Sequence, residues 1–124
     1  MSLRRLSVLQ WFGLLGAALA WTGVHVLGYG VAQAKCSTVG GGWDIAHNTW
    51  QLTLMAVGVV VVLAAQAAAI TVFRATREAD DQDPPPDGRL HFFATAAVVA
   101  NVIFLTIIVL DGLGATVSVL CRQS

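Results

Sequence analysis

Residues 57–70 read VGVVVVLAAQAAAI, a run without formal charge in which Gln66 is the only strongly polar side chain. The run lies inside a longer apolar stretch from Trp50 to Phe73, and similar stretches cover about residues 6–34 and 90–112. Each is at least as long as the roughly 20 residues that a helix needs to cross a hydrocarbon core of about 30 Å. Because a bilayer offers no water to backbone N–H and C=O groups, each stretch is expected to be helical. The sequence therefore predicts an all-α membrane protein with three transmembrane helices.

The composition supports a single integral membrane domain over residues 1–124. Hydrophobic residues make up 56% of the chain and charged residues 11%, whereas soluble domains carry about 25% charged residues. The mean hydropathy is +0.73. The lipid bilayer is therefore the first partner that we expect. A net charge of zero gives no reason to expect a nucleic-acid partner.

The basic residues near the three stretches predict how the chain is oriented. The residues expected on one side are Arg4, Arg5, Arg74, Arg77 and Arg89, and those on the other side are Lys35 and Arg122. Because Lys and Arg are enriched on the cytoplasmic side, we expect the N-terminus inside and the C-terminus outside. The chain is therefore expected to cross its membrane several times.

The two connections differ in character. The inner loop, residues 78–89, is acidic and contains Pro84–Pro86, so we expect a mobile linker. The outer loop contains Gly40–Gly42, which predicts a flexible turn, and Asp44, which is expected to cap the second helix at its N-terminus.

A cleaved secretory signal is the alternative for the N-terminal segment. Arg4 and Arg5, an apolar run and then Ala32-Gln33-Ala34 have the outline of such a signal. However, the run is longer than the 7–15 residues typical of a signal core. We therefore expect the segment to be retained as the first span.

Cys36 and Cys121 follow the first and third apolar stretches. Under the preferred orientation both lie outside, where disulfides form and persist. A structural disulfide between them is the favoured interpretation. A pair of copper-binding or redox-active thiols is the alternative, although neither cysteine has a Met or His cluster beside it.

His25 is the residue of the first stretch that most invites a functional hypothesis, because ionisable residues inside spans are costly. The simpler interpretation is a neutral imidazole bonded to a neighbouring helix, and heme, metal or quinone contact is the alternative. His47 would be the second ligand of a heme, but it lies near the start of the second span and is more simply an interfacial residue. His91 has the same interpretation at the inner end of the third span.

Gln66 and Asn101 lie inside the second and third spans, where side-chain amides commonly join helices through hydrogen bonds. Asp111 is expected to mark the outer end of the third span. The chain has no phosphate-binding loop and no H-E-x-x-H, C-x-x-C-H or G-x-S-x-G motif. We therefore expect no enzymatic activity.

Several residues occur in an order that resembles a known group. Trp21, His25 and Tyr29 are spaced by four, Cys36 follows the first span, His47 begins the second, and Cys121 lies near the C-terminus. The pattern resembles small three-helix bacterial membrane proteins encoded near heme–copper cytochrome c oxidase subunits.

The resemblance implies a setting in the respiratory chain, in a bacterial cytoplasmic (inner) membrane. The expected function is that of a non-catalytic accessory subunit or assembly factor of a larger membrane respiratory complex, linked to cytochrome c oxidase and without a cofactor of its own. The alternative is a small heme b or quinone-binding electron-transfer protein that uses His25.

Overall fold

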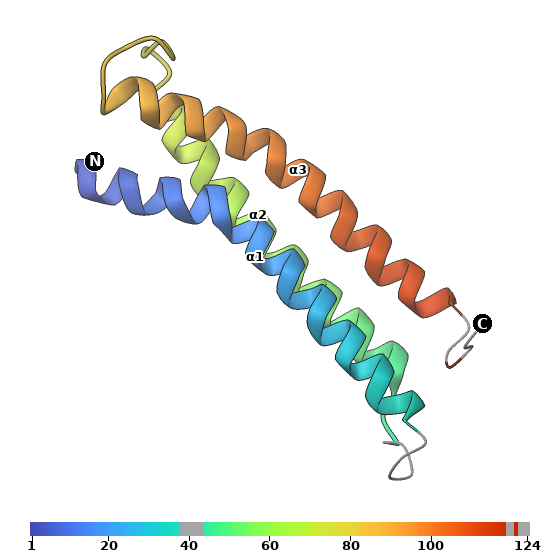
Figure 1. Ribbon diagram of the computed structural model, residues 1–124. Helices are drawn as coiled ribbons and strands as arrows, with labels where there is room; N and C mark the ends of the chain where they lie inside the picture. Colours follow the sequence, from blue (N-terminus) through green and yellow to red (C-terminus); the bar gives the residue numbers. More distant parts are fainter. Residues whose placement is uncertain (38–43, 119–120, 122–124) are drawn as a thin grey trace.

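The computed structural model describes residues 1–37, 44–118 and 121, which form three helices. They are α1 (Leu3–Cys36), α2 (His47–Ala75) and α3 (Asp87–Val117) (Figure 1). Each is long and apolar enough to cross a membrane, and the described residues contain no strand. The all-α class and the three candidate spans are thus confirmed. The glycine turn expected at residues 40–42 lies outside the described residues, as does Arg122.

The helices begin with different caps. Ser2 caps α1, because its hydroxyl accepts a hydrogen bond from the Arg5 N–H at 3.3 Å. The N-cap of α2 is Ala46, which provides no side-chain bond. The prediction that Asp44 caps this helix was therefore wrong, because Asp44 lies two residues before the N-cap. Its carboxylate is instead 4.0 Å from the Lys35 ammonium.

The connection between α2 and α3 is shorter than expected, because α3 already begins at Asp87. The residues before it form turns, in which the Asp80 N–H donates to the Asp83 carboxylate at 2.8 Å. The Asp83 carbonyl oxygen lies where a Cβ on Gly88 would have to be. A glycine at the start of α3 therefore lets the loop fold back tightly onto the helix.

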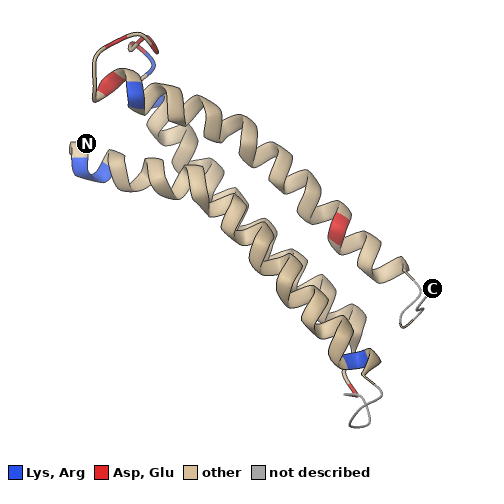
Figure 2. Ribbon diagram, viewed as in Figure 1, with Lys and Arg blue, Asp and Glu red and all other residues tan. Residues whose placement is uncertain are grey.

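Most charged residues flank the apolar helices and therefore lie at the two ends of the bundle (Figure 2). Consecutive helices run in opposite directions, which decides which of these residues share an end. We call the end that holds Arg5, Arg74 and Arg89 the arginine end. We call the end that holds Cys36 and Cys121 the disulfide end. Asp111 is the exception to this segregation, since it lies within α3, before the helix ends.

Small residues allow the helices to approach each other closely. A Cβ on Gly13 would lie 3.0 Å from the backbone nitrogen of Ala69, so α1 and α2 nearly touch there. At the same level the Asn101 amide of α3 donates to the Gly13 carbonyl oxygen at 3.0 Å. The apolar core continues toward the disulfide end through Ala17, Val62 and Ile108, which are all buried.

Candidate ligand site at the disulfide end

His25 of α1 and Asp111 of α3 form a polar pair that joins the two helices. The Nδ1 atom of His25 lies 3.0 Å from the Oδ2 atom of Asp111. The Trp21 ring stacks on the imidazole, with the ring centroids 5.6 Å apart. Both members keep substantial exposure, 57% for the His25 side chain and 42% for that of Asp111. The pair is therefore fixed in place but still open to a ligand.

The depth of this pair follows from counting residues along the helices. At 1.5 Å per residue, His25 lies about 30 Å from Arg5, and Asp111 lies about 33 Å from Arg89. These lengths match a hydrocarbon core of about 30 Å. The pair therefore lies where the bundle would leave the hydrocarbon, on the side of the disulfide end.

His47, the first residue of α2, points inward and is only 6% exposed. Its Nε2 atom lies 3.4 Å from the Ala115 carbonyl oxygen of α3. Its Nδ1 atom is buried and has no hydrogen-bond partner among the described residues. A buried ring nitrogen without a partner is costly, and this atom has almost no accessible surface through which a bound molecule could reach it.

Gln51 lies one turn further along α2 and joins it to α1. Its amide nitrogen donates to the Gly28 carbonyl oxygen at 3.0 Å, and the contact is buried. A Cβ on Gly28 would lie 2.9 Å from the Gln51 amide oxygen. The missing side chain at Gly28 therefore makes room for the amide.

The disulfide joins the end of α1 to the C-terminal segment. The two sulfur atoms of Cys36 and Cys121 are bonded, and the Cα atoms lie 5.2 Å apart, within the usual range for such bonds. The pairing expected from the sequence is thus present. It holds Cys121 at the end of α1.

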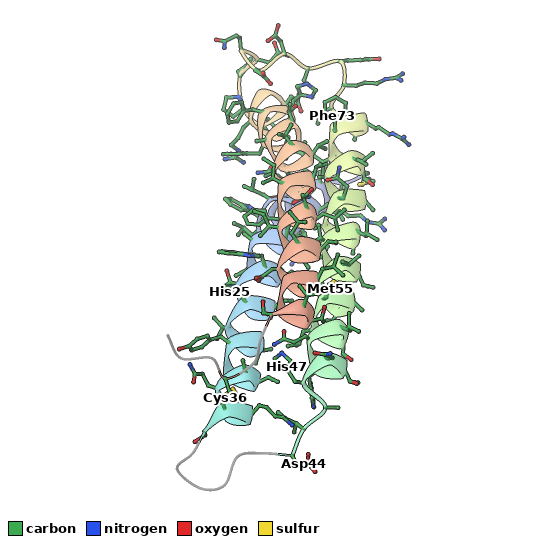
Figure 3. The ribbon with its side chains drawn as sticks, turned by 90° about the vertical axis from the view of Figure 1, so that its right-hand side faces the viewer. His25, Cys36, Asp44, His47, Met55 and Phe73 are labelled. Atoms are coloured by element: carbon green, nitrogen blue, oxygen red, sulfur yellow. A yellow bond between two sulfur atoms is a disulfide. The ribbon has the colours of Figure 1, made fainter. Side chains whose placement is uncertain are left out.

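Together these residues line a cavity of about 370 Å³ between the three helices, and the cavity is partly open to the surroundings. Figure 3 shows His25, His47 and Cys36 in the half of the bundle nearer Asp44, with Phe73 at the opposite end. The lining residues include the apolar Val24, Ala32 and Ala115 and the polar His25, His47 and Asp111. The volume lies within the range of small-molecule sites, about 300–1,000 Å³. An apolar wall with a few polar groups is also typical of such sites.

The other predicted site residues lie elsewhere. Asn101 joins helices, but through the α1 backbone rather than through Gln66. The amide oxygens of Gln66 and Asn101 are buried and have no partner among the described residues. His91 lies at the arginine end, where its Nδ1 atom is 3.2 Å from the Thr76 hydroxyl and its ring stacks on Phe73.

Two site residues were not recognised as such from the sequence. The sequence marks Asp111 only as the end of a span, and it gives no role to Gln51. A signal for Asp111 was available, because counting from the arginines puts His25 and Asp111 at nearly the same depth. No comparable signal exists for Gln51, whose partner is a backbone carbonyl group.

Comparisons with protein-family models, curated proteins and solved structures found no match to this chain.

Proposed function

We propose that this chain is a non-catalytic accessory subunit, or an assembly factor, of a membrane respiratory complex, and that it binds a small amphipathic ligand in the cavity at the disulfide end. The resemblance in the order of Trp21, His25, Tyr29 and the two cysteines supports the respiratory setting. The positions of the arginines support an N-terminus in the cytoplasm of a bacterium. The cavity would then open on the outer side of the inner membrane.

The observation that carries the binding role is a cavity of about 370 Å³ between the helices, which His25, His47 and Asp111 line together. Each helix contributes one of these residues, so the polar wall exists only in the folded bundle. The contacts with Asp111 and Ala115 hold the two rings in place before a ligand arrives. Preorganisation of this kind lowers the entropic cost of binding.

The alternative of a heme held by both histidines is less well supported. The Nε2 atom of His25 would suit a metal, because ligating histidines usually donate their other N–H to a carboxylate or carbonyl group. However, the two rings are anchored on residues 111 and 115 of α3, about 6 Å apart along its axis. A heme held by both histidines would also need a free nitrogen on His47, whose Nε2 atom is 3.4 Å from the Ala115 carbonyl oxygen and whose Nδ1 atom is buried.

The experiment is mild-detergent purification from the native membrane, with protein partners identified by mass spectrometry. Small molecules are extracted from the same samples with organic solvent and measured with the absorption spectrum. His47→Leu should lower the amount of the bound molecule at least several-fold. His91→Leu is the matched control, because it removes a hydrogen-bonded histidine at the arginine end.

We expect a colourless protein that co-purifies with respiratory subunits and carries an extractable molecule. A Soret band lost in His25→Ala would instead favour the heme alternative. Wild-type protein without any bound molecule would refute the binding role. Equal amounts of bound molecule in the two histidine variants would refute the site.

A further inference from the structure

The arginines at the arginine end are not paired with the acidic residues of the connection between α2 and α3. The ion pairs among the described residues are His25 with Asp111 and Lys35 with Asp44, both away from this end. The described arginines are all exposed, namely Arg4, Arg5, Arg74, Arg77 and Arg89. Figure 2 shows the acidic residues of this end mainly on the connection, beyond the helices. The guanidinium groups are therefore open to an external anion.

The carboxylates of this end gather around the two arginines near the end of α2. Arg74 and Arg77 line a hollow that Glu78, Asp83 and Asp87 also line. An anion in this hollow would meet three carboxylates as well as two cations, and like charges repel at these short distances. This side of the arginine end is therefore unsuited to an anionic partner.

Arg4 and Arg89 lie on helices that lack such acidic neighbours. The helix α1 contains no Asp or Glu. On α3, Asp87 precedes Arg89 by two residues, and residues two apart in a helix do not share a face. Asp87 lines the hollow near Arg74, whereas Arg89 does not. Arg89 therefore lies on a different side of α3 from the carboxylates.

An aromatic pair lies on the same side of the bundle as these two arginines. The rings of Trp11 on α1 and Phe93 on α3 have centroids 6.3 Å apart, and Trp11 is 52% exposed. Trp11 follows Arg4 by seven residues and Phe93 follows Arg89 by four, spacings that keep residues on one face of a helix. At 1.5 Å per residue, the aromatic pair lies about 6–10 Å deeper in the bundle than the arginines. We call the surface formed by these four residues the α1–α3 patch.

The order of groups in the α1–α3 patch matches the layers of a bilayer surface. The polar headgroup region covers about 5–8 Å on each side of the hydrocarbon core. The arginines therefore lie among headgroups, where a guanidinium fork fits the oxygens of a phosphate. Trp11 lies at the boundary with the hydrocarbon, where tryptophan is enriched. A soluble anion would use the arginines but not the exposed indole ring.

We propose that the α1–α3 patch binds an anionic phospholipid. Its phosphate lies between Arg4 and Arg89, and the upper part of an acyl chain contacts Trp11 and Phe93. Two cations without carboxylate partners favour a lipid of net negative charge over a zwitterionic one, whose own cation already offsets its phosphate. The patch lies at the opposite end of the bundle from the cavity, so this proposal does not depend on the proposed function.

The test compares dioleoyl phosphatidylglycerol with dioleoyl phosphatidylcholine on the purified, delipidated full-length protein. Bound lipid is counted by native mass spectrometry while each lipid is titrated. The two lipids have the same acyl chains and differ in net charge. We expect phosphatidylglycerol to bind at least about fivefold more tightly, because one basic residue near an anionic surface contributes a factor of about five.

Two double variants remove the same charge from two sides of the same end. Arg4→Gln with Arg89→Gln should lower the preference for phosphatidylglycerol at least about fivefold. Arg74→Gln with Arg77→Gln is the matched control and should change the preference little, because these arginines lie beside carboxylates. Trp11→Ala should weaken the binding of both lipids alike. All these side chains are exposed, so the variants should fold, which circular dichroism checks.

Equal binding of the two lipids to the wild-type protein would overturn the proposal. An equal loss of preference in the two double variants would also overturn it, because the attraction would then follow the total charge and not the α1–α3 patch. Displacement of bound phosphatidylglycerol by inorganic phosphate would show that the arginines alone form the site, and the assignment to a lipid would be wrong.

Discussion

The contact between Gly13 and Ala69 gives the sharpest test of the packing. Replacing Gly13 by Leu would put a side chain where the α2 backbone lies, because even a Cβ would be 3.0 Å from the Ala69 nitrogen. The helices would have to separate, and the Asn101 bond to the Gly13 carbonyl group would be lost. Overpacking costs about 1–3 kcal/mol, and an interhelical bond in a membrane contributes about 0.6–2 kcal/mol.

Gly23→Leu is the matched control, since nothing lies within 4 Å of a Cβ at that position of the same helix. Both substitutions change helix propensity in the same way, so their difference isolates the contact with α2. We expect the free energy of unfolding to be roughly 2–5 kcal/mol lower for Gly13→Leu than for Gly23→Leu.

The measurement is reversible unfolding in mixed micelles with increasing denaturing detergent, followed by circular dichroism. Equal stability of the two variants, within about 0.5 kcal/mol, would refute the close approach of α1 and α2 at Gly13. A larger loss in Gly23→Leu would mean that α1 is rotated about its axis relative to the arrangement described above.

Two further changes test the disulfide end. Cys36→Ser should lower the free energy of unfolding by at most about 4–5 kcal/mol, the loop-entropy value for two cysteines separated by 85 positions in the sequence. Two free thiols in non-reduced wild-type protein would contradict the premise. Gly28→Ala should displace the Gln51 amide and cost about 1 kcal/mol relative to Gly30→Ala, which meets open space. The same unfolding assay measures both, and a Gly28→Ala protein as stable as Gly30→Ala would show that the Gln51 bond contributes nothing.

Much of the architecture could be predicted from the sequence, because the length of each apolar stretch can be counted directly along the chain. The three spans and the Cys36–Cys121 pairing follow from length, composition and topology. The Asp44 cap could not be predicted reliably, because capping depends on which residue begins the helix. In the structure the N-cap is Ala46, two residues after Asp44. Asn101 was expected to join helices, but its partner is a backbone carbonyl group, which no sequence pattern marks.

The candidate site needed the tertiary structure for a different reason. The helices are apolar on nearly every side, so no amphipathic pattern tells which face of α1 meets α3, and lipid tails do not distinguish one apolar face from another. Small residues such as Gly13 and Gly28 set the rotation and approach of the helices through close contact. That rotation brings His25 to Asp111, and it turns the unpartnered nitrogen of His47 toward the interior. The sequence alone therefore set three spans and their depths, whereas the packing of side chains between helices made the cavity.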